Sequence, residues 1–340
     1  MSSPISGSSF VFQDVYIQSV GTTAGIVEHQ GPLGHYFDKH YPNHYHHHAS
    51  YEQAEIEMLK DAILICLKKG KVKKEEIDLY FGGDLNNQIT ACYYYANHLH
   101  RPFIGLYSAC STIGLALANA SIMIENHNIH SAMACTVSHN ATAERQFRFP
   151  LELGNQRTPT SQWTVTGSGA AILSQKGLGP YITTMTPGLI VDMGIKDANN
   201  MGAAMAPAAL STLLAHLEDT GRTPDYYDAI FTGDLGHLGK EILIDLAKNK
   251  GFDISNNYND CGVLIFDKDK QDTHSGGSGC ACIGTVFSGY LYKLLKQGKL
   301  RKILLIATGA LMNATTSQQG ESIPGIAHAI SIEMDKEPLN

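Results

Sequence analysis

The two halves of this 340-residue chain repeat each other in part, and the repeats occur in the same order. Residues 78–85 read DLYFGGDL and residues 228–235 read DAIFTGDL, with five of the eight positions identical. Further along, ACSTIG at 109–114 is matched by GCACIG at 279–284. Two matches in one order indicate an ancient duplication of a single folding unit.

Hydrophobic periodicity predicts the element order βαβαβαββ in each of two halves, residues 1–175 and 176–340. In the first half we expect strands at 11–19, 79–81, 103–106, 132–137 and 165–173, and helices at 51–69, 89–99 and from Cys110 onward. In the second half we expect strands at 181–187, 229–231, 263–266, 303–307 and 327–332, and helices at 203–217, 241–248 and from Cys280 onward. Strands that alternate with helices form mainly parallel sheets. The expected fold class is therefore α/β, with two sheets in a five-layer α-β-α-β-α arrangement.

The third helix of each half is rich in Ala, Gly and Ser and lacks charge near its start, which suits a helix packed between two sheets. The stretch at 103–124 is uncharged and long enough to cross a membrane. Its polar side chains divide it into a strand, a turn and a helix, so we interpret it as a buried segment of a soluble protein. The N-terminus lacks the features of a signal peptide, and we expect neither a signal peptide nor a transmembrane segment.

Composition excludes several classes of protein. Hydrophobic residues make up 43% of the chain and charged residues 17%, which is typical of a globular protein. The net charge of −7, without a long basic run, argues against nucleic acid as a partner. The seven cysteines have no disulfide-framework spacing, so reduced thiols are expected. Cys280 and Cys282 form a C-x-C pair, but no second pair completes a zinc site, and no metal is expected.

Cys110 is the strongest candidate for chemistry. In a duplicated fold the two buried helices would point their N-termini toward one crevice, where free N–H groups attract anions. A thiol placed there has a lowered pKa. Cys110 could therefore be a nucleophile, a pocket residue or a small apolar cap of a packed helix. Asp84 and Asp234 end matching strands near the same crevice; we expect Asp84 to cap a helix and leave Asp234 open.

The segment 138–150 follows a buried strand directly, and ligands of open α/β sheets bind at such strand ends. Arg145, Arg148 and Arg157 lie close together in sequence, which indicates an anionic ligand or structural ion pairs with Glu144 or Glu152. Histidines also crowd the stretch at 35–48. This stretch is typical of a surface loop and lacks an organised ligand spacing, so its role stays open.

These motifs give the chain a resemblance to the thiolase superfamily and, within it, to the stage V sporulation protein AD family of spore-forming bacteria. The resemblance spans nearly the whole chain, and the block at 138–148 is its most specific part. The matching segments are AG at 24–25, GPLG at 31–34, GDL at 83–85, NQ at 87–88, ACST at 109–112, SHNATAERQFR at 138–148, TVTGSG at 164–169, DMG at 192–194, MG at 201–202, AMAPA at 204–208, TGDL at 232–235, GGSGCAC at 276–282 and ATGAL at 307–311.

The resemblance implies a protein that binds pyridine-2,6-dicarboxylic acid (dipicolinic acid), often as its calcium chelate. It implies a role in moving that compound into the developing spore and releasing it on germination. It also implies a homodimer, attached peripherally at the spore inner membrane beside membrane proteins of the same operon. No cofactor is implied, apart from calcium carried with the ligand.

Enzymes of this superfamily activate the cysteine with histidine and with further histidine, cysteine or asparagine groups from the second half. Here Asp234 stands where a condensing enzyme has histidine, and the loop at 323–327 has no cysteine. His237 and His328 do not match motif positions. We therefore expect a crevice that binds without catalysis; the alternatives are an acyltransferase that uses Cys110 and a structural subunit with a vestigial pocket. The candidate ligand-binding residues are Cys110, Ser111, His139, Asn140, Arg145, Asp234, Ser278 and Cys280.

Overall fold

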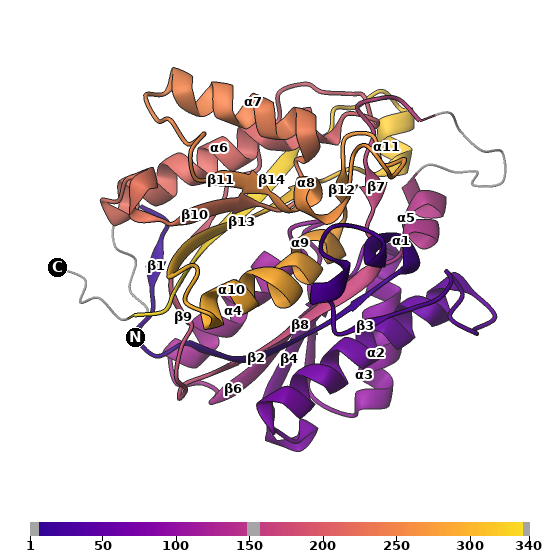
Figure 1. Cartoon of the computed structure of the whole chain (residues 1–340), viewed down its shortest axis with the longest axis vertical. Coiled ribbons are helices and arrows are strands. Elements are labelled where there is room, and N and C mark those ends of the chain that lie inside the picture. The colour runs from indigo at the N-terminus through magenta and orange to yellow at the C-terminus, as the bar shows by residue number, and fades with distance from the viewer. Residues whose placement is uncertain (1–6, 148–156, 336–340) are drawn as a thin grey trace.

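The computed structural model describes residues 7–147 and 157–335, and in them two groups of five strands share one strand order (Figure 1). The first group runs β5 (Phe103–Gly105), β4 (Leu79–Gly83), β6 (Ser131–Ser138), β8 (Gly167–Ser174) and β2 (Tyr16–Ala24). The second runs β11 (Tyr258–Asp260), β10 (Ala229–Thr232), β13 (Lys302–Ala310), β14 (Gly325–Glu333) and β9 (Tyr181–Pro187). In each group β8 or β14 runs antiparallel to both of its neighbours, and the three strands on the outer side of it are parallel to one another.

The order is the same when each strand is numbered within its own group: third, second, fourth, fifth, first. The two groups meet at their first strands, through the pair Tyr16 and Tyr181. The duplicated α/β order predicted from the sequence is therefore confirmed.

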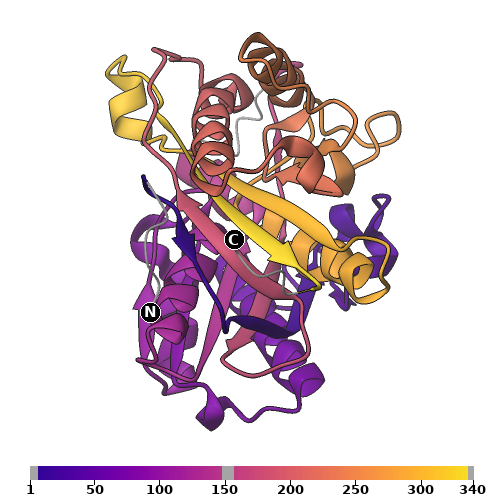
Figure 2. The same ribbon diagram turned by 90° about the vertical axis from the view of Figure 1, so that its left-hand side faces the viewer.

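Five layers are visible when the two views of the molecule are compared (Figures 1 and 2). Between the sheets lie α4 (Thr112–Glu125) and α9 (Cys280–Val286), and α9 continues through a π-helical turn (Phe287–Leu291) into α10 (Tyr292–Lys296). The first sheet is covered by α2 (Tyr51–Gly70) and α3 (Thr90–Leu99), and the second by α6 (Met201–Thr220) and α7 (Gly236–Asn249). One apolar core joins α4 and α9 to both sheets.

Small residues in the buried helices allow this close packing, as their composition suggested. A Cβ on Gly169 of β8 would lie 2.2 Å from the carbonyl oxygen of Gly284 in α9. A Cβ on Gly114 of α4 would lie 2.5 Å from Cβ of Ala307 in β13. Because a real Cβ does not approach other atoms this closely, glycine sets the distance between each buried helix and its sheet.

Two predicted elements are wrong in detail. The stretch at 263–266 lies not in a strand but at the end of a short helix, α8 (Cys261–Ile265), and the strand at this point is β11, just before it. The Asp260 carboxylate accepts the N–H of Val263 at 3.2 Å and caps that helix, which the short apolar run did not reveal. The first long strand is β2 rather than 11–19; β1 (Phe10–Val11) pairs separately with β9.

Shorter elements surround the ends of the strands. They are α1 (Ile26–His29), β3 (Lys39–His40), α5 (Asn140–Phe147), β7 (Trp163–Thr164), β12 (Gly277–Ser278) and α11 (Ala314–Gln318). The uncharged stretch at 103–124 forms β5, a turn and most of α4, as interpreted from its polar side chains. In the ranges 7–147 and 157–335, no helix is long and apolar enough to cross a membrane.

Candidate functional site

Cys110 lies in the turn before α4, at the wall of a small chamber between the two halves. Helix α4 begins two residues later, at Thr112, and Ala109 before the cysteine adopts a left-handed φ of 47°. The chamber holds about 30 Å³, which is room for little more than ordered water. Its walls are mostly apolar: Leu85, Tyr107, Ala109, Cys110, Ala143, Glu144, Phe147, Thr164, Met201, Ser278, Ala310 and Met312.

The Cys110 thiol is buried, with 6% of the residue exposed, and its Sγ lies 3.9 Å from Oγ of Ser278. Burial raises the pKa of this thiol well above its ordinary value, and the carboxylate of Asp234 raises it further. The expected lowering of the Cys110 pKa by the helix N-terminus is therefore wrong. A desolvated thiol beside a carboxylate stays protonated and is a poor nucleophile.

Asp234 follows β10 and is 1% exposed. One carboxylate oxygen accepts the Oγ–H of Ser278 and the N–H of Gly279, each at 3.0 Å. The other accepts the Oγ1–H of Thr308 from β13 at 2.7 Å. Because Gly279 immediately precedes α9, the carboxylate of Asp234 already occupies the anion position at this helix N-terminus. A ligand carboxylate placed there would meet a like charge, which argues against anion binding at the N-terminus of α9.

Ser111 and Cys280 are near the chamber but turned away from it. Ser111 Oγ donates to the carbonyl oxygen of Ser108 at 2.6 Å, and Ser108 Oγ lies 3.3 Å from Nε2 of His328. Cys280 is fully buried, and its Sγ donates to the carbonyl oxygen of Val137 at 3.0 Å. Neither residue lines the chamber.

His139 and Asn140 lie at the start of α5 and do not line the chamber either. His139 is fully buried: Nε2 donates to the carbonyl oxygen of His44 at 2.8 Å, and Nδ1 accepts the N–H of Ala141 at 3.1 Å. Burial lowers the pKa of His139 to about 4, so the ring is neutral. It anchors the histidine-rich loop. The Asn140 N–H donates to Oγ1 of Thr166 at 2.9 Å.

The arginines form ion pairs outside the chamber. Arg145, which is exposed, pairs with Glu52 of α2, a residue that the sequence analysis did not name as a partner. Arg157 pairs with Asp272 at 2.6 Å. These contacts favour the structural alternative for both arginines. Two further residues of that stretch lie outside the described part of the chain: Arg148 and Glu152.

Asp84 is the counterpart of Asp234 in the first half; it is not the N-cap residue of α3, which is Ile89, but it supplies a capping contact from outside the helix. Its carboxylate accepts the N–H groups of Asn86 and Cys92, each at 2.9 Å. Cys92 lies in the first turn of α3, so Asp84 secures the start of this helix.

A larger groove adjoins the chamber, and the sequence analysis missed most of its residues. It holds about 430 Å³ and shares Tyr107, Phe147 and Met312 with the chamber. We call it the outer groove. Its lining is Asn86, Asn87, Gln88, Ile89, Tyr93, Gly105, Leu106, Tyr107, Gln146, Phe147, Leu311, Met312, Asn313 and Ala314. Parts of three matched segments reach it, at 87–88, 146–147 and 311, but none of them was predicted to line a groove, because neutral amides in loops have no chemical signature of their own.

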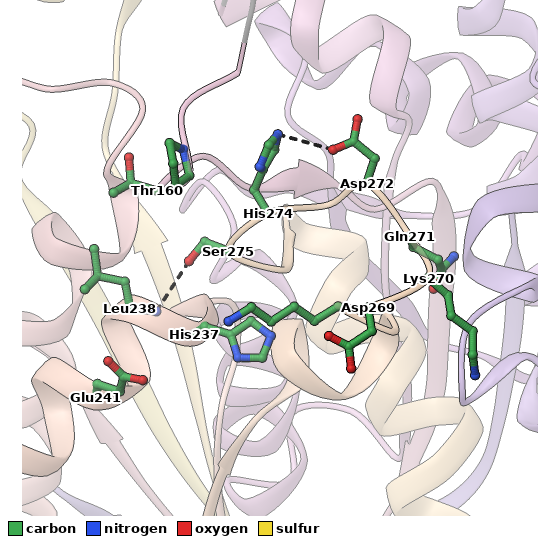
Figure 3. A pocket seen from close by; sticks show the side chains of 12 residues that line it. Thr160, His237, Leu238, Glu241, Asp269, Lys270, Gln271, Asp272, His274 and Ser275 are labelled. Atoms are coloured by element: carbon green, nitrogen blue, oxygen red, sulfur yellow. Dashed lines mark hydrogen bonds and ion pairs between the residues drawn. The ribbon is translucent and has the colours of Figure 1, made fainter.

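A separate polar cleft of about 690 Å³ lies between the start of α7 and the loop before β12 (Figure 3). His237 lines this cleft. Asp272 and His274, which also line it, contact each other through Oδ1 and Nε2. The described lining residues of the cleft and of the chamber do not overlap. His237 therefore does not take the place of a base beside Cys110.

Metal ligation finds no support in the part of the chain that the structure describes. Its histidine, cysteine and acidic side chains form no group of three or more that could hold a metal ion. His40 of the histidine-rich stretch stacks its ring on that of His29, with centroids 3.6 Å apart. Stacked rings pack against each other and do not converge on a common point.

Comparisons with known proteins agree with the motifs. The family model for stage V sporulation protein AD matches residues 7–333. The chain is 44% identical over 326 residues to stage V sporulation protein AD of Bacillus subtilis, with 96% of each chain covered.

Solved structures of condensing enzymes resemble the fold. The 3-oxoacyl-[acyl-carrier-protein] synthase III of Aquifex aeolicus matches with a TM-score of 0.57 at 13% identity, over 94% of this chain and 99% of the other. A variant of Xanthomonas campestris OleA with bound lauric acid and lauroyl-CoA matches with a TM-score of 0.59 at 13% identity, over 95% and 100%. These likenesses confirm a thiolase-like fold. On its sequence, this chain belongs to the stage V sporulation protein AD family and is a sporulation protein.

Proposed function

We propose that this protein binds dipicolinic acid or its calcium chelate without catalysis, and acts in the uptake of that compound into the spore and its release on germination. The observation that carries this proposal is the environment of Asp234. By the family resemblance, this residue stands where a condensing enzyme has histidine. It accepts hydrogen bonds from Ser278, Gly279 and Thr308 and so acts as a structural anchor. The fold of a condensing enzyme is kept, while Asp234 takes the position of its histidine and is engaged in structural hydrogen bonds, which favours binding as the use of the crevice.

Acyl transfer with Cys110 is disfavoured by the same geometry. The thiol is held protonated by burial and by Asp234. Burial also lowers the pKa of His328 to about 4, and its Nε2 lies 3.3 Å from Ser108 Oγ. A nucleophilic cysteine needs an adjacent base or a lowered pKa.

The outer groove is the site that fits this ligand. Its volume of about 430 Å³ falls in the range of small-molecule sites, whereas the chamber is too small. Among the described lining residues of both, Glu144 supplies the only formal charge, and the groove offers the amides of Asn86, Asn87, Gln88, Gln146 and Asn313. Neutral amides suit a neutral ligand. The calcium chelate, in which Ca²⁺ offsets two carboxylates, fits this lining better than the free dianion.

The wild-type protein is therefore expected to bind the calcium chelate about tenfold more tightly than the free acid. Placing a charge at Gln146 reports on the position of the ligand. We expect Gln146→Lys to raise affinity for the free acid, and Gln146→Glu to lower it, each by about fivefold to tenfold, because one charge then faces a dianion. Isothermal titration calorimetry with and without calcium measures the wild-type affinities for the chelate and for the free acid, and the affinity of each variant for the free acid.

Gln297→Glu is the matched control, since Gln297 is exposed at the end of α10, outside the groove. It should leave the affinities for the chelate and for the free acid unchanged.

Acetyl-CoA is titrated in parallel to test the acyltransferase alternative. Thioester turnover that disappears in Cys110→Ala would favour the acyltransferase instead, and absence of any dicarboxylate binding by the wild-type protein would exclude the proposed function.

We also propose a homodimer that assembles through β5. This strand is the last in the order of the first sheet, so one of its edges has no neighbouring strand in the described residues. Exposed apolar side chains lie on or beside this strand: Ile104 within it, Tyr107 just after it, and Tyr93, whose ring packs edge-on against Phe103. Two copies of β5 related by a two-fold axis would pair antiparallel and join their sheets. Peripheral attachment at the spore inner membrane, beside membrane proteins of the same operon, is part of the proposal.

A further inference from the structure

Two buried carboxyl groups lie behind the outer groove and share one asparagine. Glu55 of α2 and Asp84 after β4 are both 0% exposed. The side-chain amide of Asn86 donates to Glu55 Oε2 at 2.9 Å, while the Asn86 backbone N–H donates to Asp84 Oδ1 at 2.9 Å. Thr142 of α5 donates its hydroxyl to the same Glu55 oxygen at 2.8 Å. Asn86 is itself a wall residue of the outer groove.

The two carboxyl groups differ in how many of their oxygens accept a hydrogen bond. Both oxygens of Asp84 accept backbone N–H groups, from Asn86 and Cys92. Glu55 Oε1, by contrast, is buried without a hydrogen-bond partner among the described residues. An ionised carboxylate leaves such an oxygen uncompensated at high cost, whereas a neutral carboxyl costs far less. Burial raises the pKa of Glu55, and the negative charge of Asp84 raises it further, so the pair carries a shared proton near neutral pH.

Within the described ranges, no neighbouring cation on the elements packed around Glu55 neutralises the pair. Burial raises the pKa values of the thiols of Cys92 in α3, Cys135 in β6 and Cys280 in α9, so they are neutral. His139, before α5, is neutral as well. Strand β8 has no ionisable side chain, and β2 has only Tyr16 at its start. The cation on α5, Arg145, is exposed and paired with Glu52 of α2. The charge that acts on Glu55 is that of Asp84.

The turn that follows Asn86 depends on its surroundings for its shape. Gln88 and Ile89 have φ values of 56° and 48°, the left-handed region that side chains other than glycine rarely adopt. Ile89 is β-branched, which makes this conformation still less favourable. Such a conformation persists only where contacts on both sides fix it. Both residues line the outer groove, so the groove has its shape only while this turn is held.

We propose that the Glu55–Asp84 pair links ligand binding in the outer groove to the uptake of one proton. With one proton on the pair, Asn86 is held from both sides and the turn at 86–89 keeps its binding geometry. When both carboxyls ionise, two buried negative charges repel each other across Asn86 and the turn is released. The inference rests on the proposed function only in naming the ligand; the turn and its proton can be observed without it.

The direction of the pH effect follows from linkage. A carboxyl group whose pKa is raised in the binding-competent state holds its proton more tightly there than in the released state. Raising the pH therefore favours the released state, and ligand affinity falls. One linked proton limits this fall to about tenfold per pH unit. The ligand's own carboxyls are already ionised near neutral pH and do not contribute.

The test is calorimetric titration of the full-length wild-type protein with calcium dipicolinate between about pH 6.5 and about pH 9, in two buffers with different heats of ionisation. We expect affinity to fall with pH and about one proton to be taken up per ligand at the alkaline end. Glu55→Gln, whose amide stays uncharged, should bind with an affinity independent of pH. Hydrogen exchange of the amides at 84–92, measured without ligand, should show the turn opening with pH in the wild-type protein but not in Glu55→Gln.

Glu28→Gln is the control. Glu28 is 1% exposed, and burial raises its pKa to about 7, but it lies on α1 and accepts the N–H of Thr166 away from the groove. It should keep the pH dependence of the wild-type protein.

The inference would be overturned if neither the ligand affinity nor the hydrogen exchange of the turn at 86–89 changed with pH in the wild-type protein. Absence of binding at every pH would instead overturn the proposed function, while hydrogen exchange still decides whether the pair controls the turn. If Glu55→Gln does not fold, proton uptake by the wild-type protein decides the question alone.

Discussion

Replacing Asp234 by alanine is expected to lower the free energy of unfolding by about 3–5 kcal/mol. The carboxylate is buried and accepts from Ser278, Gly279 and Thr308, so its loss leaves buried donors without an acceptor. These contacts connect the end of β10 to β13 and to the residues just before α9. Their loss is therefore expected to loosen the start of α9. Urea unfolding followed by circular dichroism measures the change.

Asp234→Asn separates the charge from the shape of the site. The asparagine side chain has the same size, but it no longer places a negative charge beside Cys110, so the thiol pKa falls. We expect faster alkylation of Cys110 by iodoacetamide at mildly alkaline pH, with the modified cysteine located by mass spectrometry. Asp260→Asn is the control, because Asp260 is also buried and bonded to backbone N–H groups but raises the pKa of Cys261 instead. Equal alkylation of Cys110 in the wild type and both variants would contradict the influence of Asp234 on the thiol.

The layered fold could be predicted because it depends on patterns that repeat along the sequence. The duplicated motif around Asp84 and Asp234 and the alternation of strands with helices predict the order of the elements along each half, while the order of the strands in the sheet is seen only in the structure. The strand predicted at 263–266 was wrong because a short apolar run fits a strand or a buried helix equally well. Only the capping contact between Asp260 and Val263 decides this case, and it is visible only in three dimensions.

The candidate site was harder to predict because its properties come from contacts between distant segments. The sequence places Cys110 near a helix start, and that alone suggests a reactive thiol. Burial of the thiol reverses that effect, and Asp234, which raises the thiol pKa further, lies 124 positions away in the sequence. Gln146, Asn87 and Gln88 lie in segments that match the family, but a neutral amide in such a segment does not indicate that it lines a groove. Glu55 did leave a weak signal, since it is an acidic residue among apolar neighbours in a helix that packs on a sheet.

Ile104→Arg is expected to break the proposed dimer. Ile104 lies in the middle of β5 with 41% of its surface exposed. In a two-fold interface each copy contributes the same residue, so two arginines would face each other across the paired edges. Like charges brought together in this way cost several kcal/mol, which weakens the dimer by about a hundredfold or more. Sedimentation velocity at micromolar concentration should show the wild-type dimer and a monomeric variant.

Leu64→Arg controls for the general effect of a new surface charge. Leu64 is exposed to a similar degree, 47%, but it lies on α2, away from the β5 edge. This variant should remain dimeric, and both variants should keep the circular dichroism of the wild-type protein. A dimer that survives Ile104→Arg would place the interface elsewhere, and a monomeric wild-type protein would exclude the dimer. Because the outer groove contains Gly105 and Tyr107, immediately after Ile104, a dimer through β5 would also bring the grooves of the two copies next to the interface.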